Sequence, residues 1–223
     1  MNRWGAGSWG DKVAAWSGVI FAVLAALGFI VLGQPDADAT GDEIVQYFAD
    51  NDSAMQWQAL LFGLAAVFYL WFGGTIASAV RRAEGDPAGR VPAIIVVTAA
   101  ASAAIYLAGE AAWVALARPT EAGVSSSLYD LGGNAFVMSG FIAAAFAWAV
   151  TLGVMRTGLL ADWVGWLGTA TMALLVASSV ITLFAELDSS FSQVLGSIAF
   201  FVFLAWVGIT SLVYSMGMRS STM

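Results

Sequence analysis

A row of polar side chains follows one helical face of an apolar stretch near the middle of the chain. Thr98, Ser102, Tyr106 and Glu110 succeed one another at intervals of four residues, and Trp113 comes three residues later. Residues three and four apart lie on the same face of a helix, so a helix here would align these side chains. A carboxyl group beside hydroxyl groups in apolar surroundings can bind a ligand or a proton. The row therefore predicts a binding site inside a membrane-embedded helix.

Neighbouring apolar stretches end near the same side and supply further candidates for this site. At the helical rise, Glu110 lies about 28 Å from the start of its stretch, close to one edge of the hydrocarbon. The candidates that could join it are Asp130, Asn134 and Glu186, with Arg118 as a counter-charge. The alternatives are an interface acid at Glu110, a helix cap at Asp130 and a solvated helix end at Glu186.

An acidic segment early in the chain offers a second kind of site. Asp36, Asp38 and Thr40 occupy positions one, three and five of a calcium-binding loop, and Asp42 follows two residues later. This spacing brings hard oxygen ligands together. Position twelve, where calcium loops need a bidentate acid, is Tyr47. The alternative, a solvated acidic loop, is the favoured interpretation.

The residue types that are missing exclude many kinds of chemistry. The chain has no Cys and no His, which removes thiol nucleophiles, imidazole bases and the usual zinc sites. No acid or base falls at the predicted middle of an apolar stretch, where ion-coupled transporters usually place one. We expect no cofactor and no nucleic-acid partner. A bound lipid is possible, and a calcium ion at the outer acidic segment is a weaker prediction.

The candidate residues require a membrane protein to position them. Hydrophobic residues make up 60% of the 223 residues and charged residues only 10%. A helix needs about 20 apolar residues to cross a bilayer. The predicted fold is a single all-α, polytopic bundle over 1–223 with six transmembrane helices. Their approximate bounds are 13–32, 54–80, 91–117, 128–155, 163–187 and 191–216.

The segment 33–53 connects the first two spans and carries six acids and no base. Thr40 and Glu43 have the spacing of a capping box, which predicts a short amphipathic outer helix near 41–50. The same spacing joins Ser53 to Gln56 and recurs at the predicted start of the fourth span. The segment should rest on the bundle or on the lipid headgroups.

Basic residues predict the orientation of the bundle. Seven of the eight fall on one predicted side: Arg3, Lys12, Arg81, Arg82, Arg90, Arg156 and Arg219. Loops rich in Lys and Arg stay in the cytoplasm. Both termini are therefore predicted to be cytoplasmic, and the acidic segment lies outside.

Four motifs give the whole chain a recognisable pattern: GDEIVQYFAD, WFGG, RRAEG and RTGLLADWVGWLG. In these motifs it resembles a broad group of uncharacterised six-span bacterial integral membrane proteins. The resemblance covers nearly the full chain and implies a six-helix fold in the bacterial cytoplasmic membrane. It implies no catalytic residues.

Two main hypotheses for function follow. The favoured one is a non-enzymatic membrane subunit that binds a lipid, a small ligand or a partner helix through an outward-facing polar site. The alternative is a passive or weakly coupled transporter or channel for a small solute, lined by the polar row. A third is a lipid-processing enzyme that uses Glu110 and Asp130 as paired acids. The expected partners are membrane lipids, a second copy of the chain or other membrane subunits.

Overall fold

The computed structural model describes residues 9–33, 35, 39–85, 89–118, 122–184 and 190–220. Within these ranges the regular structure is entirely α-helical, which confirms the predicted all-α class. The helices are α1 (Trp9–Leu32), α2 (Gly41–Asp50), α3 (Asp52–Glu84), α4 (Arg90–Leu116), α5 (Ala122–Thr157), α6 (Asp162–Phe184) and α7 (Ser190–Ser220).

Every helix except α2 is long and apolar enough to cross a membrane, so the part of the chain described here has six candidate spans. The prediction of a six-span bundle is confirmed at this level. Most helices extend beyond the apolar stretches that predicted them, because their polar ends continue the helix. α5 shows this most clearly, since it begins at Ala122 and not near residue 128. α6 ends at Phe184, and the predicted end of its span at 187 lies outside the described residues.

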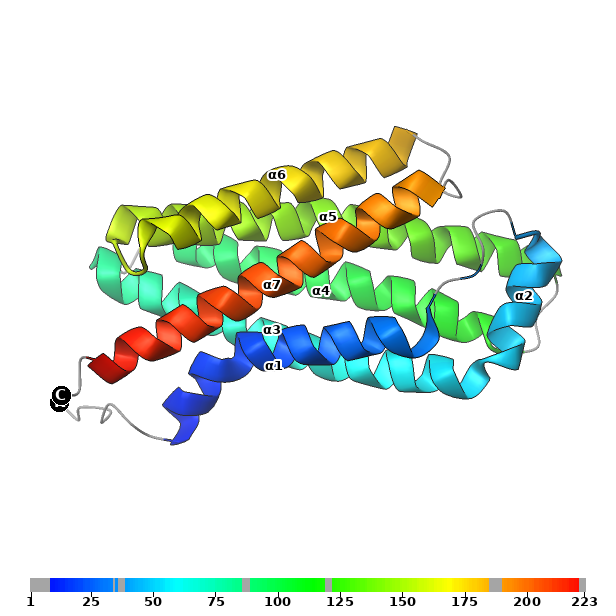
Figure 1. The fold of residues 1–223 in the computed structure, drawn as a ribbon, viewed down its shortest axis with the longest axis horizontal. Coiled ribbons are helices and arrows are strands. Elements are labelled where there is room, and N and C mark those ends of the chain that lie inside the picture. The colour runs from blue at the N-terminus through cyan, green and yellow to red at the C-terminus, as the bar shows by residue number, and fades with distance from the viewer. Residues whose placement is uncertain are drawn as a thin grey trace.

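The six long helices form a closed ring. Each packs mainly against two neighbours, in the order α1, α3, α4, α5, α6, α7 and back to α1, and α3 also touches α5 (Figure 1). α7 crosses the bundle obliquely: it begins near the end of α6 and reaches α1 lower down, where the Ser211 hydroxyl donates to the Ala15 carbonyl at 2.6 Å. A ring of six helices encloses an interior that side chains alone must fill.

The short helix α2 lies across one end of the ring, which we call the α2 end (Figure 1). Its first turn has the predicted capping box, because Glu43 accepts from the Thr40 backbone N–H at 2.7 Å and Thr40 accepts from Glu43 N–H. Phe48 points into the bundle and is fully buried, while the Tyr47 hydroxyl donates to the Leu32 carbonyl at 2.6 Å. The predicted amphipathic helix is thus confirmed, and it rests on the bundle.

The half of the bundle away from α2, which we call the closed half, is tightly packed. A Cβ added at Gly73 would lie 2.9 Å from Ala99, and one at Gly153 would lie 2.9 Å from Val80. Small residues at these points let the helix backbones approach closely, as is typical of membrane bundles. The fully buried large side chains of this half include Phe72, Ile76, Val80, Ile95, Val150, Val154, Val164 and Trp206.

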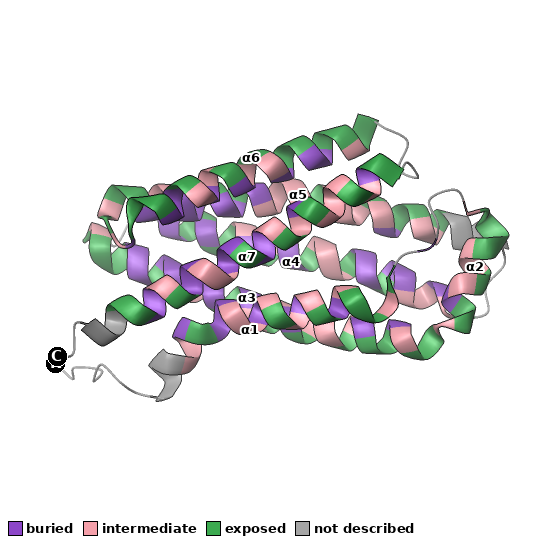
Figure 2. Ribbon diagram, viewed as in Figure 1, coloured by how far each residue is buried: buried purple, intermediate pink, exposed green. Residues whose placement is uncertain are grey.

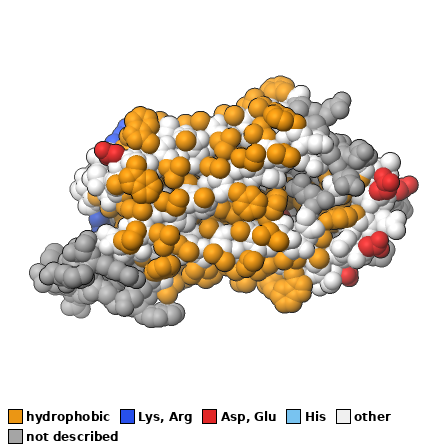
Figure 3. Space-filling view, viewed as in Figure 1, with side chains coloured by type: hydrophobic (Ala, Val, Ile, Leu, Met, Phe, Trp, Pro, Cys, Tyr) orange, Lys and Arg blue, Asp and Glu red, His pale blue; other side chains and the backbone are white. Residues whose placement is uncertain are grey.

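The surface of the bundle is divided by polarity. Buried residues follow the inward faces of the helices and exposed ones the outward faces (Figure 2). Hydrophobic side chains cover the middle of the face seen in Figure 3, and acidic side chains gather at the α2 end. Large exposed apolar residues such as Trp57, Trp71 and Phe184 belong to this apolar surface. On this face, an apolar band between two polar ends matches a protein surrounded by lipid.

Candidate functional site

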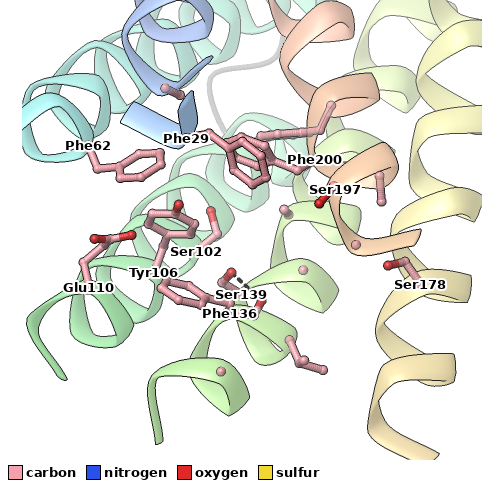
Figure 4. A pocket seen from close by; sticks show the side chains of 18 of the residues that line it. Phe29, Phe62, Ser102, Tyr106, Glu110, Phe136, Ser139, Ser178, Ser197 and Phe200 are labelled. Carbon is pink, nitrogen blue, oxygen red and sulfur yellow. Dashed lines mark hydrogen bonds between the residues drawn. The ribbon is translucent and has the colours of Figure 1, made fainter. Parts of the chain in front are cut away.

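The six long helices enclose a cavity of ≈ 300 Å³ in the half of the bundle nearer α2. Figure 4 shows side chains from several helices that face this space. Each helix contributes to the lining; one example from each in chain order is Phe29, Gln58, Glu110, Ser139, Ser178 and Ser197. The cavity is therefore a property of the whole ring and not of one helix pair.

Aromatic rings close the cavity at the middle of the bundle. The Tyr69 ring packs against Phe21 at 4.9 Å, Phe146 at 5.1 Å and Phe203 at 5.9 Å between centroids. We call these four side chains the aromatic floor. Trp206 lies directly beneath it, in contact with both Phe146 and Phe203. The cavity is thus blind, because the closed half begins where the floor ends.

At its other end the cavity reaches the α2 end of the bundle. Asp130 and Gly33 are exposed there and line the cavity, so we call this region the mouth. Trp113 stacks on Tyr129 with centroids 5.7 Å apart and planes 6° apart, and its indole N–H donates to the Tyr129 carbonyl at 3.3 Å. Phe48 of α2 packs against both rings. The short helix therefore holds one side of the mouth in place.

Glu110 is a carboxyl group buried in the cavity wall. Only 3% of its surface is exposed, and Gln58 of α3, itself 4% exposed, donates from Nε2 to Glu110 Oε2 at 3.4 Å. Tyr106, one turn earlier on α4, is a second polar neighbour. A buried carboxyl needs such partners, because burial without them is costly. Phe62 and Phe136 pack on either side of Tyr106, at 5.1 and 4.9 Å between centroids.

Most of the predicted row lines the cavity. Ser102 lies near the floor, Tyr106 and Glu110 lie above it, and Trp113 lies toward the mouth. Glu110 is buried within the ring, which favours the site interpretation over an acid at the membrane interface. Thr98, at the start of the row, is not part of the lining; its hydroxyl donates to the Ile94 carbonyl at 2.6 Å.

The other predicted site residues divide into three groups. Asp130 lines the mouth. Asn134 is exposed, lies outside the lining and donates from its amide to the Asp130 carbonyl at 2.8 Å. Arg118 is exposed and lines a separate groove between α3 and α4, which it shares with Glu110. Glu186 lies outside the described residues.

The predicted calcium loop falls largely outside the described part of the chain. Asp36 and Asp38 are not described, and Asp42 is exposed in the first turn of α2. The Thr40 hydroxyl is occupied by the capping box, where it donates to Glu43 at 2.8 Å. Among the described residues, no group of three or more acidic side chains is placed to hold a metal ion. The calcium hypothesis stays a prediction.

The sequence interpretation missed two features of the site. One is Gln58, an amide inside an apolar stretch, and the other is a set of hydroxyl groups on the wall opposite Glu110. That set comprises Ser139, Ser178, Ser179, Thr182 and Ser197. An amide two turns into a membrane span and the adjacent serines at 178 and 179 were signals that could have been used.

Comparison of the chain with protein-family models, curated proteins and solved structures finds no match. The resemblance to six-span bacterial proteins therefore stays a prediction. The geometry of the cavity and the chemistry of its lining are the features that bear on function.

Proposed function

We propose that this multi-pass membrane protein is a non-enzymatic binding protein, which holds a small amphipathic molecule in its central cavity. The observation that carries the proposal is a blind cavity lined by all six long helices, with a buried carboxyl and amide pair in its wall. Cavities of this size, mostly apolar with a few placed polar groups, are typical of small-molecule sites.

The lining favours a molecule with two chemically different ends. Polar groups are concentrated in the Glu110 and Gln58 pair and in the hydroxyl wall, while Phe29, Phe62 and Phe200 supply apolar surface. A purely apolar ligand would leave the polar groups without partners, and a purely polar one would gain nothing from the rings. An amphipathic ligand satisfies both.

We place the mouth on the outer side of the bacterial cytoplasmic membrane. Among the described residues, Arg81, Arg82, Arg90 and Arg156 lie at the end of the bundle away from α2. Acidic residues gather at the α2 end, and basic ends face the cytoplasm in membrane proteins. In this orientation the ligand comes from the outer medium or from the outer leaflet.

Filling the cavity tests the proposal. Gly196 lines the cavity, and a Cβ at this position meets nothing within 4 Å, so Gly196→Leu should place its side chain in the open space. Gly63 has equally open surroundings but is not part of the lining, which makes Gly63→Leu the matched control. Native mass spectrometry of gently extracted protein should find a retained small molecule on the wild type and on Gly63→Leu, and none on Gly196→Leu.

Two results would contradict a binding function. One is wild-type protein that retains no small molecule when extracted in mild detergent and in lipid nanodiscs alike. The other is a molecule that stays bound to Gly196→Leu as well as to the control, because that molecule would then occupy a different place.

A passive carrier is the second candidate, favoured by one specific observation. Thr151 Oγ1, Trp206 Nε1 and Thr210 Oγ1 are buried below the aromatic floor without a hydrogen-bond partner. Unpaired buried polar groups are costly and are often tied to function, so they could belong to a path that opens when the floor moves. Saturable uptake of the retained molecule into proteoliposomes, lost in Gly196→Leu, would support a carrier. Binding without uptake would reject it.

A further inference from the structure

Three of the hydroxyl groups that line the cavity, those of Ser102, Ser139 and Ser197, donate their protons to carbonyl groups of their own helices. Ser139 donates to the Phe136 carbonyl at 2.7 Å, and Ser197 donates to the Gln193 carbonyl at 2.8 Å. A hydroxyl has one proton and two acceptor lone pairs. Once the proton is used, the group can offer only acceptors to a ligand. The cavity walls around Ser139 and Ser197 therefore favour a ligand that donates hydrogen bonds.

The floor and the mouth follow the same rule. Ser102 donates to the Ala99 carbonyl at 3.2 Å, so its contact with the Tyr69 hydroxyl at 3.1 Å leaves Tyr69 as the donor of that pair. The single N–H of the Trp113 indole is used by the Tyr129 carbonyl. The donor hydrogens at these positions are already used in hydrogen bonds within the protein, so these positions offer a ligand hydrogen-bond acceptors.

The charge of the lining has one sign. Among the described residues that line the cavity, Glu110 and Asp130 carry carboxyl groups and none is Lys or Arg. Gln58 donates to one oxygen of Glu110 and Tyr106 is a second polar neighbour, whereas a carboxylate accepts up to about four hydrogen bonds. A positively charged donor would satisfy the remaining positions and offset the cost of burying the carboxylate.

Aromatic rings lie near the carboxyl group of Glu110 on the cavity side (Figure 4). Tyr106 packs between Phe62 and Phe136 (Figure 4). Phe136 in turn meets Trp113 edge to face at 4.7 Å. Cations are attracted to the faces of such rings, most strongly where water is excluded. The cavity of ≈ 300 Å³ is at the small end of ligand sites, which excludes a two-chain lipid as its full content.

From these observations we infer that the ligand is a compact organic amine in its protonated form. Its ammonium group donates to Glu110, and its apolar body lies among the surrounding phenylalanines. The inference rests on the proposed binding function and names the class of molecule that the same cavity takes.

Four probes of similar size and different head group test this inference. They are 2-phenylethylamine, its trimethylammonium derivative, 2-phenylethanol and 3-phenylpropanoate. Isothermal titration of the purified full-length protein in detergent should show the amine binding about tenfold more tightly than the alcohol, because a charge-assisted hydrogen bond is added. The trimethylammonium compound, which keeps the charge but has no N–H, should bind more weakly than the amine, and the carboxylate most weakly of all.

Two variants test whether the preference for the amine depends on Glu110. Glu110→Gln removes the charge at nearly constant shape and should bring the affinity for the amine down to that for the alcohol. Glu43→Gln removes an acid at the same end of the bundle but outside the lining, and it should leave the order of the probes unchanged. Equal binding of amine and alcohol by the wild type, or an amine preference that survives in Glu110→Gln, would overturn the inference.

The results distinguish a wrong ligand class from the absence of a binding function. If the alcohol or the carboxylate binds best and Gly196→Leu abolishes that binding, the cavity is a binding site and the amine inference is wrong. If none of the four probes binds and no retained molecule is found, both proposals fall.

Discussion

At particular positions, glycines in the two halves of the bundle serve opposite purposes, although Gly109 and Gly132 also permit close contact in the half with the cavity. In the closed half, glycines let helices touch: a Cβ at Gly168 would meet Thr151 Oγ1 and would lie 2.9 Å from Trp206 Nε1. In the half with the cavity, Gly133 and Gly196 face open space. Glycine thus permits close approach where the opposite helix is near and enlarges the interior where it is not. Its meaning depends on what lies across the ring.

The largest difference between the halves is expected when the same large side chain is placed in each of them. Gly168→Leu should lower the free energy of unfolding by about 3 kcal/mol, because the buried indole of Trp206 cannot move aside. Gly196→Leu should leave it unchanged or raise it by up to about 1 kcal/mol, since Leu is the better helix former. Thermal unfolding of both variants in the same detergent measures the difference. Equal losses would show that the cavity is absent from the folded protein.

Removing one partner of the buried pair Gln58 and Glu110 should change the free energy of unfolding by a smaller amount, and only through the half with the cavity. Gln58→Leu removes the donor to Glu110 and should cost about 2 kcal/mol, because the carboxyl loses a hydrogen bond. The double variant Gln58→Leu with Glu110→Leu should recover most of this loss, since replacing both partners of a buried pair by apolar groups is nearly neutral. A double-mutant cycle tests this expectation: the free energy of unfolding is measured for Gln58→Leu, for Glu110→Leu and for the double variant. Additive losses would mean that the two side chains do not interact.

The smallest expected effect is a pH dependence of local stability that is confined to the α2 end and absent from the closed half. The Thr40 backbone N–H, followed by the Thr40 hydroxyl, holds the pKa of Glu43 below its ordinary value of 4.5. The folded pKa is thus lower than the unfolded one, so the capping box stabilises α2 above the unfolded pKa and loses this effect as the pH falls through the folded pKa. Hydrogen exchange protection of residues 41–50 should decline as the pH is lowered from about 7 to about 3.

Two controls accompany the pH measurement. Glu43→Gln should make the protection of α2 nearly independent of pH, which separates this carboxyl from the other acids of the segment. The amides of α7 around Trp206, in the closed half, should keep their protection over the same range. A decline of equal size in both places would indicate general unfolding and not the loss of a cap.

The six spans could be predicted because length and hydropathy alone define a membrane helix. Their ends could not, because polar residues continue a helix when it leaves the bilayer. Ser53 and Ser127 both have capping-box spacing, yet α3 begins at Asp52 with Asn51 before it, and Ser127 lies inside α5. The box at Thr40 formed as predicted, since no earlier helical residue competes with it.

About half of the site could be predicted, for a reason that lies in helix geometry. Ser102, Tyr106, Glu110 and Trp113 share one helix, so their spacing brings them to one face. Gln58 joins Glu110 only because α3 and α4 are neighbours in the ring, and spacing along the sequence does not contain that information.

Asn134 lies outside the lining, although the prediction put it with Asp130 in the site. It follows Asp130 by four residues, but the face of α5 that lines the cavity runs through Gly133 and Phe136, so Asn134 falls just outside it. The stripe of small and aromatic residues on α5 was the better guide to the inward face.

The aromatic floor has an electrical consequence. When water or ions fill the space above it, the potential of the medium at the α2 end extends down to Tyr69 and Phe203. Most of the membrane voltage then drops across the closed half, over roughly half the thickness of the bilayer. Moving one elementary charge through that drop is worth about 2.3 kcal/mol per 100 mV. A charged ligand resting on the floor would feel little of the voltage, whereas any group that moved through the floor would feel most of it.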